Sequence, residues 1–505
     1  MQLAMNGHGP RHAQLAHALR AAILEGRLRS GSRLPASREM AVQLRISRNT
    51  VIAAYEQLRA EGYVHARVGA GTYVSEVEPA RTRPARVAPV TAPTRYVERL
   101  RALDFSILRR GGDEGARWDM QIGEPVTDPA LFTAWRRTLA RAALYADPRY
   151  PHSAGLPALR EALADYLARR RGVDAAPDEI IVVAGAQQGM GLVARVLVEE
   201  RDSVVLEEPH YFGLRWTLQT HGARVVGVPV DDAGLVVERL PAVSAAKSPR
   251  LVCVTPAHQF PLGATLSLAR RQALLAYAAA RRCWIVEDDY DSEFRYDSEP
   301  LPALRSLDRD GRVIHVGTFS KTLFPGLRLG YVVAPRGLVR DLIAAKRLHD
   351  FGGPTIEQAA MARFIADGSF ERHIRKASGA LRARREVVLT GLAPHAAVEV
   401  VGAQAGMHLA AWLHGFDRAR CQALIALART RGLGIHSIAP HYLRPPRRSG
   451  LLFGYAGLAV RELEAAMQVF GECMRALAPS RRRCSELGRG QVLPFAPARG
   501  AKGKT

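Results

Sequence analysis

The hydrophobic positions near the amino terminus recur at helical spacing. Leu15, Leu19 and Ile23 repeat every fourth residue and predict a helix over Arg11–Leu24. Two more helices are expected: one opening at Ser37, which we assign as its cap, and one over Arg48–Ala60 after the cap residue Ser47. Alternating residues then predict two short strands, 63–65 and Gly71–Val74, around a glycine turn.

Two short helices across a tight turn, followed by a hairpin, are typical of a winged helix-turn-helix that places its third helix in the major groove of DNA. Arg48 is suited to a guanine edge, and its neighbours are hydrogen-bonding types suited to phosphates. The alternative is a small helical domain with solvated arginines. The predicted DNA contacts are Arg38, Ser47, Arg48, Asn49, Thr50, Arg67, Gly69 and Gly71.

The middle of the chain has a different rhythm, in which short apolar runs alternate with helical stretches. This alternation predicts an α/β domain with a mostly parallel central sheet. The strand-like runs are 180–184, 204–207, 225–228, 251–255, 284–287, 313–316 and 331–334. The helical stretches include 157–171, 189–199 and 268–282.

Composition shifts divide the chain into four parts. Residues 10–77 form the predicted DNA-binding domain, and 78–117 form a linker rich in Pro, Arg and Ala. Residues 118–478 form the α/β domain, with a large part at about 118–357 and a small part at about 358–478. Residues 479–505 are a basic tail that we expect to be disordered.

Composition narrows the classes of protein to consider. A chain of 505 residues with 48% hydrophobic content is expected to fold as several domains. It contains no apolar run approaching the roughly 20 residues of a membrane-spanning helix. Its five cysteines form no CxxC pair, so we expect neither a disulfide framework nor a metal site, and a cytoplasmic location.

The formal charge of +23 is concentrated in the flanks. Residues 1–78 hold ten arginines against six glutamates, and 79–117 hold nine arginines against four acids. The tail holds seven basic residues against one glutamate. This distribution favours a polyanionic partner such as DNA for the ends of the chain, against the alternative of a generally basic proteome.

Lys321 is unusual among the six lysines of the chain. It lies in the segment GTFSKTLFPGLRLGY, 317–331, between two strand-like runs, whereas the other five have charged or small polar neighbours. A desolvated lysine amine is the nucleophile that forms Schiff bases with carbonyl compounds, above all pyridoxal phosphate. The alternative is a structural lysine that extends from a loop to solvent.

A second segment, CWIVEDDY at 283–290, combines a short strand with acids and a tyrosine. In parallel sheets, functional side chains lie at the carboxyl ends of strands. A carboxylate there can pair with a protonated pyridine nitrogen, and a tyrosine hydroxyl can reach the phenolate oxygen of pyridoxal phosphate. Two such acids are otherwise often a helix cap or metal ligands.

These residues carry a family resemblance. The segments DDYDSEFR at 288–295, SKT at 320–322 and PGLRLG at 325–330 resemble the cofactor site of fold-type I aminotransferases. The segments LPASRE, SRNTV, YEQLRAEG and GAGTYV resemble a GntR-type DNA-binding domain. Together they resemble the MocR group of bacterial transcription regulators over residues 10–477. The expected fold class is therefore multidomain, a winged helix-turn-helix plus a fold-type I α/β transferase domain.

The resemblance implies pyridoxal 5'-phosphate as the cofactor and a role for each site residue. Lys321 would form the Schiff base, Asp288 would meet the pyridine nitrogen, and Tyr290 and His258 would meet the phenolate oxygen. Tyr211 would stack on the ring, with a buried core tyrosine as the alternative. The phosphate would be held by backbone amides of Ala186 and Gln187 and by Thr318, Ser320 and Arg328.

One departure concerns the ligand. Aminotransferases usually carry an arginine for the substrate carboxylate in a strand near the carboxyl end, but the matching segment SGLLFGY, 449–455, has none; Arg444, Arg447 and Arg448 lie upstream. The expected effector is thus an amino acid, an amine or pyridoxal phosphate itself.

The function implied is a homodimeric regulator that binds promoter DNA, with RNA polymerase as a further candidate partner. It would sense an amino compound through aldimine exchange at Lys321, which would favour a different domain arrangement. The first alternative is an active aminotransferase that carries a DNA-binding domain. The second is a domain that has lost its cofactor and serves only for dimerisation.

Overall fold

The computed structural model describes residues 7, 9–67, 69–76, 92–105, 116–242, 248–296 and 301–477. The chain divides into two compact units, Met1–Ala92 and Pro93–Thr505. The predicted tail and residues 78–91 and 106–115 of the predicted linker lie outside the described residues. No helix in the described part of the chain is long and apolar enough to cross a membrane.

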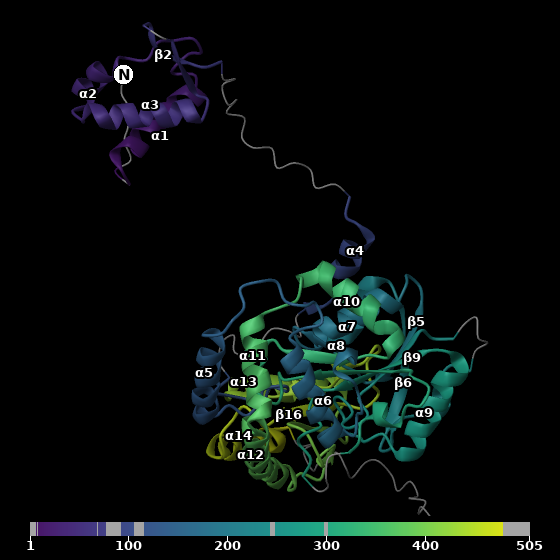
Figure 1. The fold of residues 1–505 in the computed structure, drawn as a ribbon. Coiled ribbons are helices and arrows are strands. Elements are labelled where there is room, and N and C mark those ends of the chain that lie inside the picture. Colours follow the sequence, from purple (N-terminus) through teal and green to yellow (C-terminus); the bar gives the residue numbers. More distant parts are fainter. Residues whose placement is uncertain are drawn as a thin grey trace, which may run out of the picture. The chain divides into compact units, whose positions relative to one another are not determined.

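The first unit has the predicted order of three helices and a hairpin (Figure 1). Its elements are α1 Arg11–Leu24, α2 Ser37–Leu44, α3 Arg48–Ala60, β1 Val64–Arg67 and β2 Gly71–Val74. Leu15, Leu19, Val51 and Leu58 are fully buried between α1 and α3, in agreement with the helical spacing that predicted them. β1 and β2 pair antiparallel, with Val64 opposite Val74.

The predicted cap of α2 is wrong by one residue. Ser37 is the first helical residue, and Ala36 is the cap residue, with extended backbone. The Glu39 carboxylate accepts a hydrogen bond from the Ala36 amide at 3.2 Å, a contact that needs a glutamate three residues after the cap residue. The cap of α3 is confirmed, because the Ser47 hydroxyl accepts from the Thr50 amide at 3.1 Å.

An eight-stranded sheet forms the centre of the second unit, in the order β4-β11-β10-β9-β8-β5-β6-β7. Its strands are β4 Ile180–Val183, β5 Ser203–Glu208, β6 Arg224–Asp231, β7 Gly234–Leu235, β8 Leu251–Val254, β9 Trp284–Asp289, β10 Val313–Thr318 and β11 Gly330–Val333. The five strands from β10 to β6 run parallel, as predicted. β11 is antiparallel to both neighbours, because no crossover helix separates it from β10.

Helices cover both faces of this sheet. Val204 and Leu206 of β5 pack toward α7, α8 and α10, whereas Val205 between them packs toward α9 on the other face. Such two-sided burial explains why the strands read as continuous apolar runs in the sequence. The helices of this part are α5 Pro129–Ala143, α6 Pro157–Arg171, α7 Ala186–Leu197, α8 Phe212–His221, α9 Leu268–Arg281 and α10 Arg336–Asp350.

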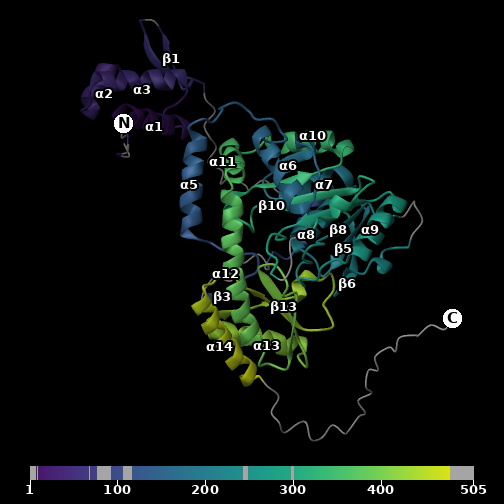
Figure 2. The same cartoon turned by 60° about the horizontal axis from the view of Figure 1, so that its bottom comes forward.

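A smaller antiparallel sheet and four helices follow, and α12 packs along α14 (Figure 2). The helices are α11 Thr355–Ala366, α12 Ser369–Leu392, α13 Arg418–Thr430 and α14 Val460–Ala476. The sheet order is β12-β13-β16-β15, with β12 Val398–Val401, β13 His408–Leu413, β15 His436–Ser437 and β16 Gly450–Gly454. A separate pair joins β14 Leu433–Gly434 to β3 Trp118–Asp119, so the chain from residue 118 first enters the small part.

Part of the predicted linker is helical. α4, Arg95–Arg101, is capped by the Thr94 hydroxyl, and Arg99 forms an ion pair with Glu200. Arg99 also donates a hydrogen bond to the carbonyl of Thr220 at 3.4 Å, at the end of α8. Arg99 is one of the arginines that favoured the interpretation of this segment as a linker. It anchors α4 to the rest of the second unit.

Candidate DNA-binding surface and candidate cofactor site

The predicted cofactor residues follow neighbouring strands of the large sheet. β9 and β10 run parallel, so Asp288 at the end of β9 and Lys321 after β10 lie at the same edge. His258 follows β8 and Tyr211 follows β5, which are the next two strands in the sheet order. The sheet therefore gathers four residues that are far apart in the sequence, although their roles stay predictions.

The amine of Lys321 lies against the backbone of a distant segment. Its Nζ donates a hydrogen bond of 2.7 Å to the carbonyl of Gly123, and a Cβ on Gly123 would lie 2.7 Å from the same nitrogen. Burial lowers the pKa of Lys321 below its ordinary value, while the carboxylates of Glu124, Asp291 and Asp288 act in the opposite direction. A lowered pKa increases the share of neutral amine, the form that attacks carbonyl carbon.

The acids of β9 point alternately to the two faces of the sheet. On one face, Glu287 lies 3.0 Å from Nδ1 of His315 and accepts hydrogen bonds from two backbone amides. On the same face, Asp289 pairs with Nε of Arg171 at 2.8 Å, and both side chains are buried. Glu287 and Asp289 thus each have a hydrogen-bonding partner of their own.

Asp288, between them, is directed to the other face. Its Oδ1 is buried and has no hydrogen-bond partner among the described residues. Burial, together with the negative charges of Asp289 and Asp291, raises the pKa of Asp288 to about 8. A carboxylate in this situation is stabilised by a cationic partner such as a protonated ring nitrogen, so Asp288 fits the predicted role better than Asp289.

His258 and Tyr290 form a hydrogen-bonded group with Asp291. Nδ1 of His258 lies 2.9 Å from Oδ2 of Asp291 and 2.8 Å from the hydroxyl of Tyr290. Nε2 of His258 is buried without a partner in the part of the chain that is described. The carboxylate orients the ring, and Nε2 lies beside Gly263, where a Cβ would be 2.9 Å from it. The sequence prediction did not include Asp291, since nothing in its spacing separates it from the other acids of DDYDSE.

A candidate anion site lies where α7 begins. Gly185 is the cap residue and has a left-handed backbone with φ 81°. The next amides, of Ala186 and Gln187, belong to the first helical turn and have no acceptor within the helix. The guanidinium of Arg328 donates to the carbonyl of Ala184 at 2.7 Å and lies across Gly185, where a Cβ would be 3.2 Å from it. Helix amides and an arginine together suit a phosphate.

The remaining predicted phosphate residues lie beside this site. The Thr318 hydroxyl donates to the Ser320 hydroxyl at 3.0 Å. The side chain of Gln187 is engaged with α8, because its amide donates to the Thr217 hydroxyl at 2.7 Å. Gln187 can therefore contribute only its backbone amide, as predicted for a phosphate contact.

Tyr211 is half-buried at the start of α8. Its ring meets that of Phe260 edge to face, with centroids 5.9 Å apart, and burial together with Asp288 raises the pKa of its hydroxyl to about 12. A Cβ on Gly213 would lie 2.6 Å from the ring. Tyr211 is thus fixed next to Asp288, and stacking on a cofactor ring stays a prediction.

The predicted DNA contacts lie on exposed surfaces of the first unit. Arg48 and Asn49 are exposed at the start of α3, and Arg48 lies within hydrogen-bond reach of the Ser37 hydroxyl, at 3.3 Å. The hydroxyls of Ser47 and Thr50 lie 2.8 Å apart, and Ser47 also caps the helix. Arg48 and Asn49 are therefore the freer pair for base contacts.

The hairpin carries the predicted contact Arg67, and a further arginine that the sequence prediction did not include, Arg33, lies beside it. Arg67 is exposed and stacks over Tyr73, 5.0 Å from the ring centroid. Arg33, outside the hairpin, lies against Gly71, where a Cβ would be 2.8 Å from its Nε. Gly71 has φ 113° and is thus needed both for the turn and for this contact. A single arginine in a turn offers no spacing signal that could have identified it.

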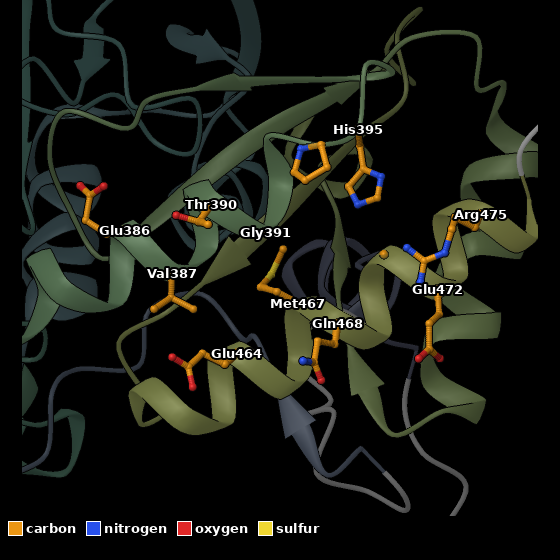
Figure 3. A pocket seen from close by; sticks show the side chains of 12 residues that line it. Glu386, Val387, Thr390, Gly391, His395, Glu464, Met467, Gln468, Glu472 and Arg475 are labelled. Carbon is orange, nitrogen blue, oxygen red and sulfur yellow. The ribbon is translucent and has the colours of Figure 1, made fainter.

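A separate cavity of about 630 Å³ lies between α12 and α14 (Figure 3). His395, Met467 and Arg475 line it together with three glutamates. None of the predicted site residues lines this cavity. It therefore adds nothing to the cofactor site.

Comparison with known proteins gives two family matches. Residues 119–444 match "Aminotransferase class I and II", and residues 11–74 match "Bacterial regulatory proteins, gntR family". The probable rhizopine catabolism regulatory protein MocR of Rhizobium meliloti is 36% identical over 93% of this chain and 95% of its own length. The chain belongs to the MocR group of GntR-type transcription regulators.

Another similar MocR-type protein is the pyridoxine biosynthesis regulator PdxR of Corynebacterium glutamicum, 31% identical over 90% of this chain and 94% of its own length. Among solved structures, the multiple substrate aminotransferase of Thermococcus profundus matches with a TM-score of 0.68. It is 25% identical over 75% of this chain and 97% of its own. These matches confirm the predicted fold class, a GntR-type winged helix-turn-helix plus a fold-type I aminotransferase domain.

Replacing Arg48 by Ala should weaken specific DNA binding by about 1–3 kcal/mol, because a bidentate contact to a guanine edge is worth about that much. Fluorescence anisotropy with operator DNA measures the loss. Arg59→Ala is the matched control, since Arg59 is exposed at the opposite end of α3. An unchanged footprint for Arg48→Ala would remove Arg48 from the recognition set.

Replacing Asp288 by Asn should alter how the stability of the cofactor-free protein depends on pH. The pKa of Asp288 is about 8 in the folded chain against 3.8 for an ordinary aspartate. Its contribution to stability is fully present below the lower value and is lost as the pH rises toward the higher one. Asp288→Asn should therefore become more stable than the parent as the pH rises from about 5 to about 8.

The midpoint of urea unfolding measures this difference at each pH. Asp310→Asn serves as the control, because Asp310 is an exposed aspartate on a surface turn. A midpoint difference between Asp288→Asn and the parent that is the same at both pH values would contradict the expectation.

Proposed function

We propose that this regulator binds pyridoxal 5'-phosphate and senses an amino compound by aldimine exchange at Lys321. The observation that carries the proposal is the convergence of three groups at one edge of the sheet. They are the buried amine of Lys321, the unpartnered carboxylate of Asp288, and the helix amides beside Arg328. The same chain carries the helix-turn-helix.

The bound cofactor supplies a carbonyl carbon that condenses with amines. Asp288 would hold its ring nitrogen, Tyr211 its ring face, and Tyr290 and His258 its phenolate oxygen. An effector amine would take the place of Lys321 at that carbon, one carbon–nitrogen bond replacing the other. Lys321 leaves as a free amine, so no oxidant, reductant or net water is needed.

Each of the two units implies a binding partner. Promoter DNA would bind α3 and the hairpin, and the effector would bind at Lys321. We propose a cytoplasmic homodimer, since cofactor sites of this fold lie at subunit interfaces, with RNA polymerase as a further candidate partner. The similar regulators carry names that refer to different metabolism, rhizopine catabolism and pyridoxine biosynthesis. These names therefore do not identify the effector of this chain, and its chemical class is inferred from the residues of the candidate site.

An active aminotransferase is the second candidate. The amine, carboxylate, tyrosine and phosphate site together suit transamination, and the solved structures that match are aminotransferases. β16 carries no arginine for a substrate carboxylate, which favours the sensor. Repeated turnover with an oxo-acid acceptor would reverse this ranking.

α4 and Phe105, which lead toward the DNA-binding unit in the sequence, contact α8, the helix that begins next to Tyr211. Tyr211 caps α8, and its ring lies 5.1 Å from that of Phe212, which lies 4.7 Å from Trp216. Trp216 in turn meets Phe105, just after α4, at 5.1 Å. A row of aromatic rings thus connects the cofactor site to the anchored end of the linker.

This row suggests how the effector would act on DNA binding. An effector shifts an equilibrium only by its difference in affinity for two arrangements. A ligand that moves Tyr211 would change the packing of α8, and with it the position in which Phe105 and Arg99 hold the linker. We propose that α4 and Phe105 couple the two units.

A panel of amines and amino acids, with absorbance and DNA affinity measured in parallel, tests the proposal. A compound that changes the cofactor absorbance should also change operator affinity by about fivefold or more. Lys321→Ala should lose both responses. Absorbance changes that leave DNA affinity unaltered would contradict the sensor.

Replacing Phe105 by Ala should separate the two responses, because it removes the contact to Trp216 without altering the site. The absorbance response should persist and the DNA response should fall. Tyr96→Ala is a matched control, since Tyr96 is an exposed aromatic residue on α4. A full DNA response in Phe105→Ala would remove this row of rings from the coupling.

A further inference from the structure

Three carboxylates raise the pKa of the Lys321 amine, and two of them already have an assigned partner. Asp291 is engaged with His258, and Asp288 is the proposed partner of the cofactor nitrogen. Glu124 is the third, and its charge acts on Lys321 more strongly than those of the other two. The proposed function assigns no role to Glu124.

The backbone fixes Glu124 beside the amine. Lys321 donates to the carbonyl of Gly123, the residue directly before Glu124. A Cβ on Gly457 would lie 3.3 Å from Cβ of Glu124, so this glycine leaves room for the glutamate. Nearby, Gly454 lies against the backbone of Gln121. The segment that carries Glu124 thus packs against the end of β16, where an aminotransferase would place its carboxylate-binding arginine.

The arginines near β16 in the sequence are engaged elsewhere. Arg448 pairs with Glu399 and stacks over Trp412, 4.9 Å from the ring centroid. Arg444 and Arg447 line a cavity of about 970 Å³ along β6. In place of a cation, this wall carries Glu124, the residue that follows the Gly123 carbonyl bound by Lys321.

Arg384 of α12 is the rival cation, because it donates to the carbonyl of Ala456, next to Gly457. The carboxylate that raises the pKa of Arg384 is Glu462 of α14, whereas Glu124, Asp291 and Asp288 raise the pKa of Lys321. The field around the reacting nitrogen therefore favours a ligand with added positive charge.

We infer that the effector is a short diamine or polyamine, whose second ammonium is bound by Glu124 while its first amine exchanges with Lys321. This inference rests on the proposed function and names the class of its ligand. An α-amino acid would bring its carboxylate toward Glu124 and be repelled. A charge-assisted hydrogen bond to Glu124 would instead favour the diamine.

Three compounds with four carbons each test the inference on protein loaded with pyridoxal phosphate. They are 1,4-diaminobutane, butylamine and 4-aminobutyrate, whose far ends are an ammonium, a methyl group and a carboxylate. In the parent, the diamine should shift the cofactor absorbance at a concentration about tenfold or more below that of butylamine. Glu124→Gln should abolish this difference, and Glu124→Asp should restore part of it.

Arg384→Ala is the matched control and should keep the preference for the diamine. If 4-aminobutyrate is preferred and Arg384→Ala removes that preference, the inference is wrong and Arg384 is the specificity residue. The inference is also wrong if Glu124→Gln keeps the preference for the diamine and changes only the pH at which the absorbance titrates. Glu124 would then act only as a counter-ion of Lys321.

The failure of this inference is distinguishable from the failure of the proposed function. If all three compounds shift the absorbance of the parent equally, only the role of Glu124 is wrong. If none of them does, and no amine or amino acid of the wider panel does, exchange at Lys321 is wrong and the inference falls with it. A far-ultraviolet circular dichroism spectrum equal to that of the parent confirms that each variant is folded.

Discussion

The burial of one amine organises the second unit. An ammonium group loses hydration when it leaves water, so a buried lysine tends toward the neutral form unless charges oppose this. Lys321 lies at the end of β10 with its nitrogen against the Gly123 carbonyl, and burial outweighs the three acids around it. The other residues of the candidate site lie around this amine, where the proposed cofactor would bind.

Charge pairing in the sheet shows how this is arranged. β9 ends in three consecutive acids, which would repel one another if all were unpaired. Arg171 pairs with Asp289 and His315 lies 3.0 Å from Glu287, whereas Oδ1 of Asp288 has no hydrogen-bond partner among the described residues. Arg171 belongs to α6, on the covering layer, so the packing of that helix helps to decide which acid is free.

Much of this arrangement could be predicted from the sequence. Apolar runs located the strands, and the rule that functional groups follow parallel strands grouped Lys321, Asp288, His258 and Tyr211 at one edge. The cap Ser47 and the helical spacing of Leu15 and Leu19 likewise located the helices of the DNA-binding unit. Each of these signals lies within a few consecutive residues of the chain.

Contacts between distant segments could not be predicted in this way. Gly123 and Glu124 reach Lys321 because β3 pairs with β14 and carries its segment into the small part, which no local pattern reveals. Asp291 is chosen among several acids by the position of His258, and α4 is held by Glu200 and Trp216 from outside its own sequence. Tertiary contacts of this kind decide specificity and coupling.

The most direct test of the account is reduction of purified protein with borohydride after incubation with pyridoxal phosphate, followed by mass spectrometry of the peptides. Borohydride converts a Schiff base to a stable amine and so marks the lysine that formed it. The account predicts a pyridoxyl label on Lys321. An unlabelled peptide at this position, or a label on Lys346 or another lysine in its place, would contradict it.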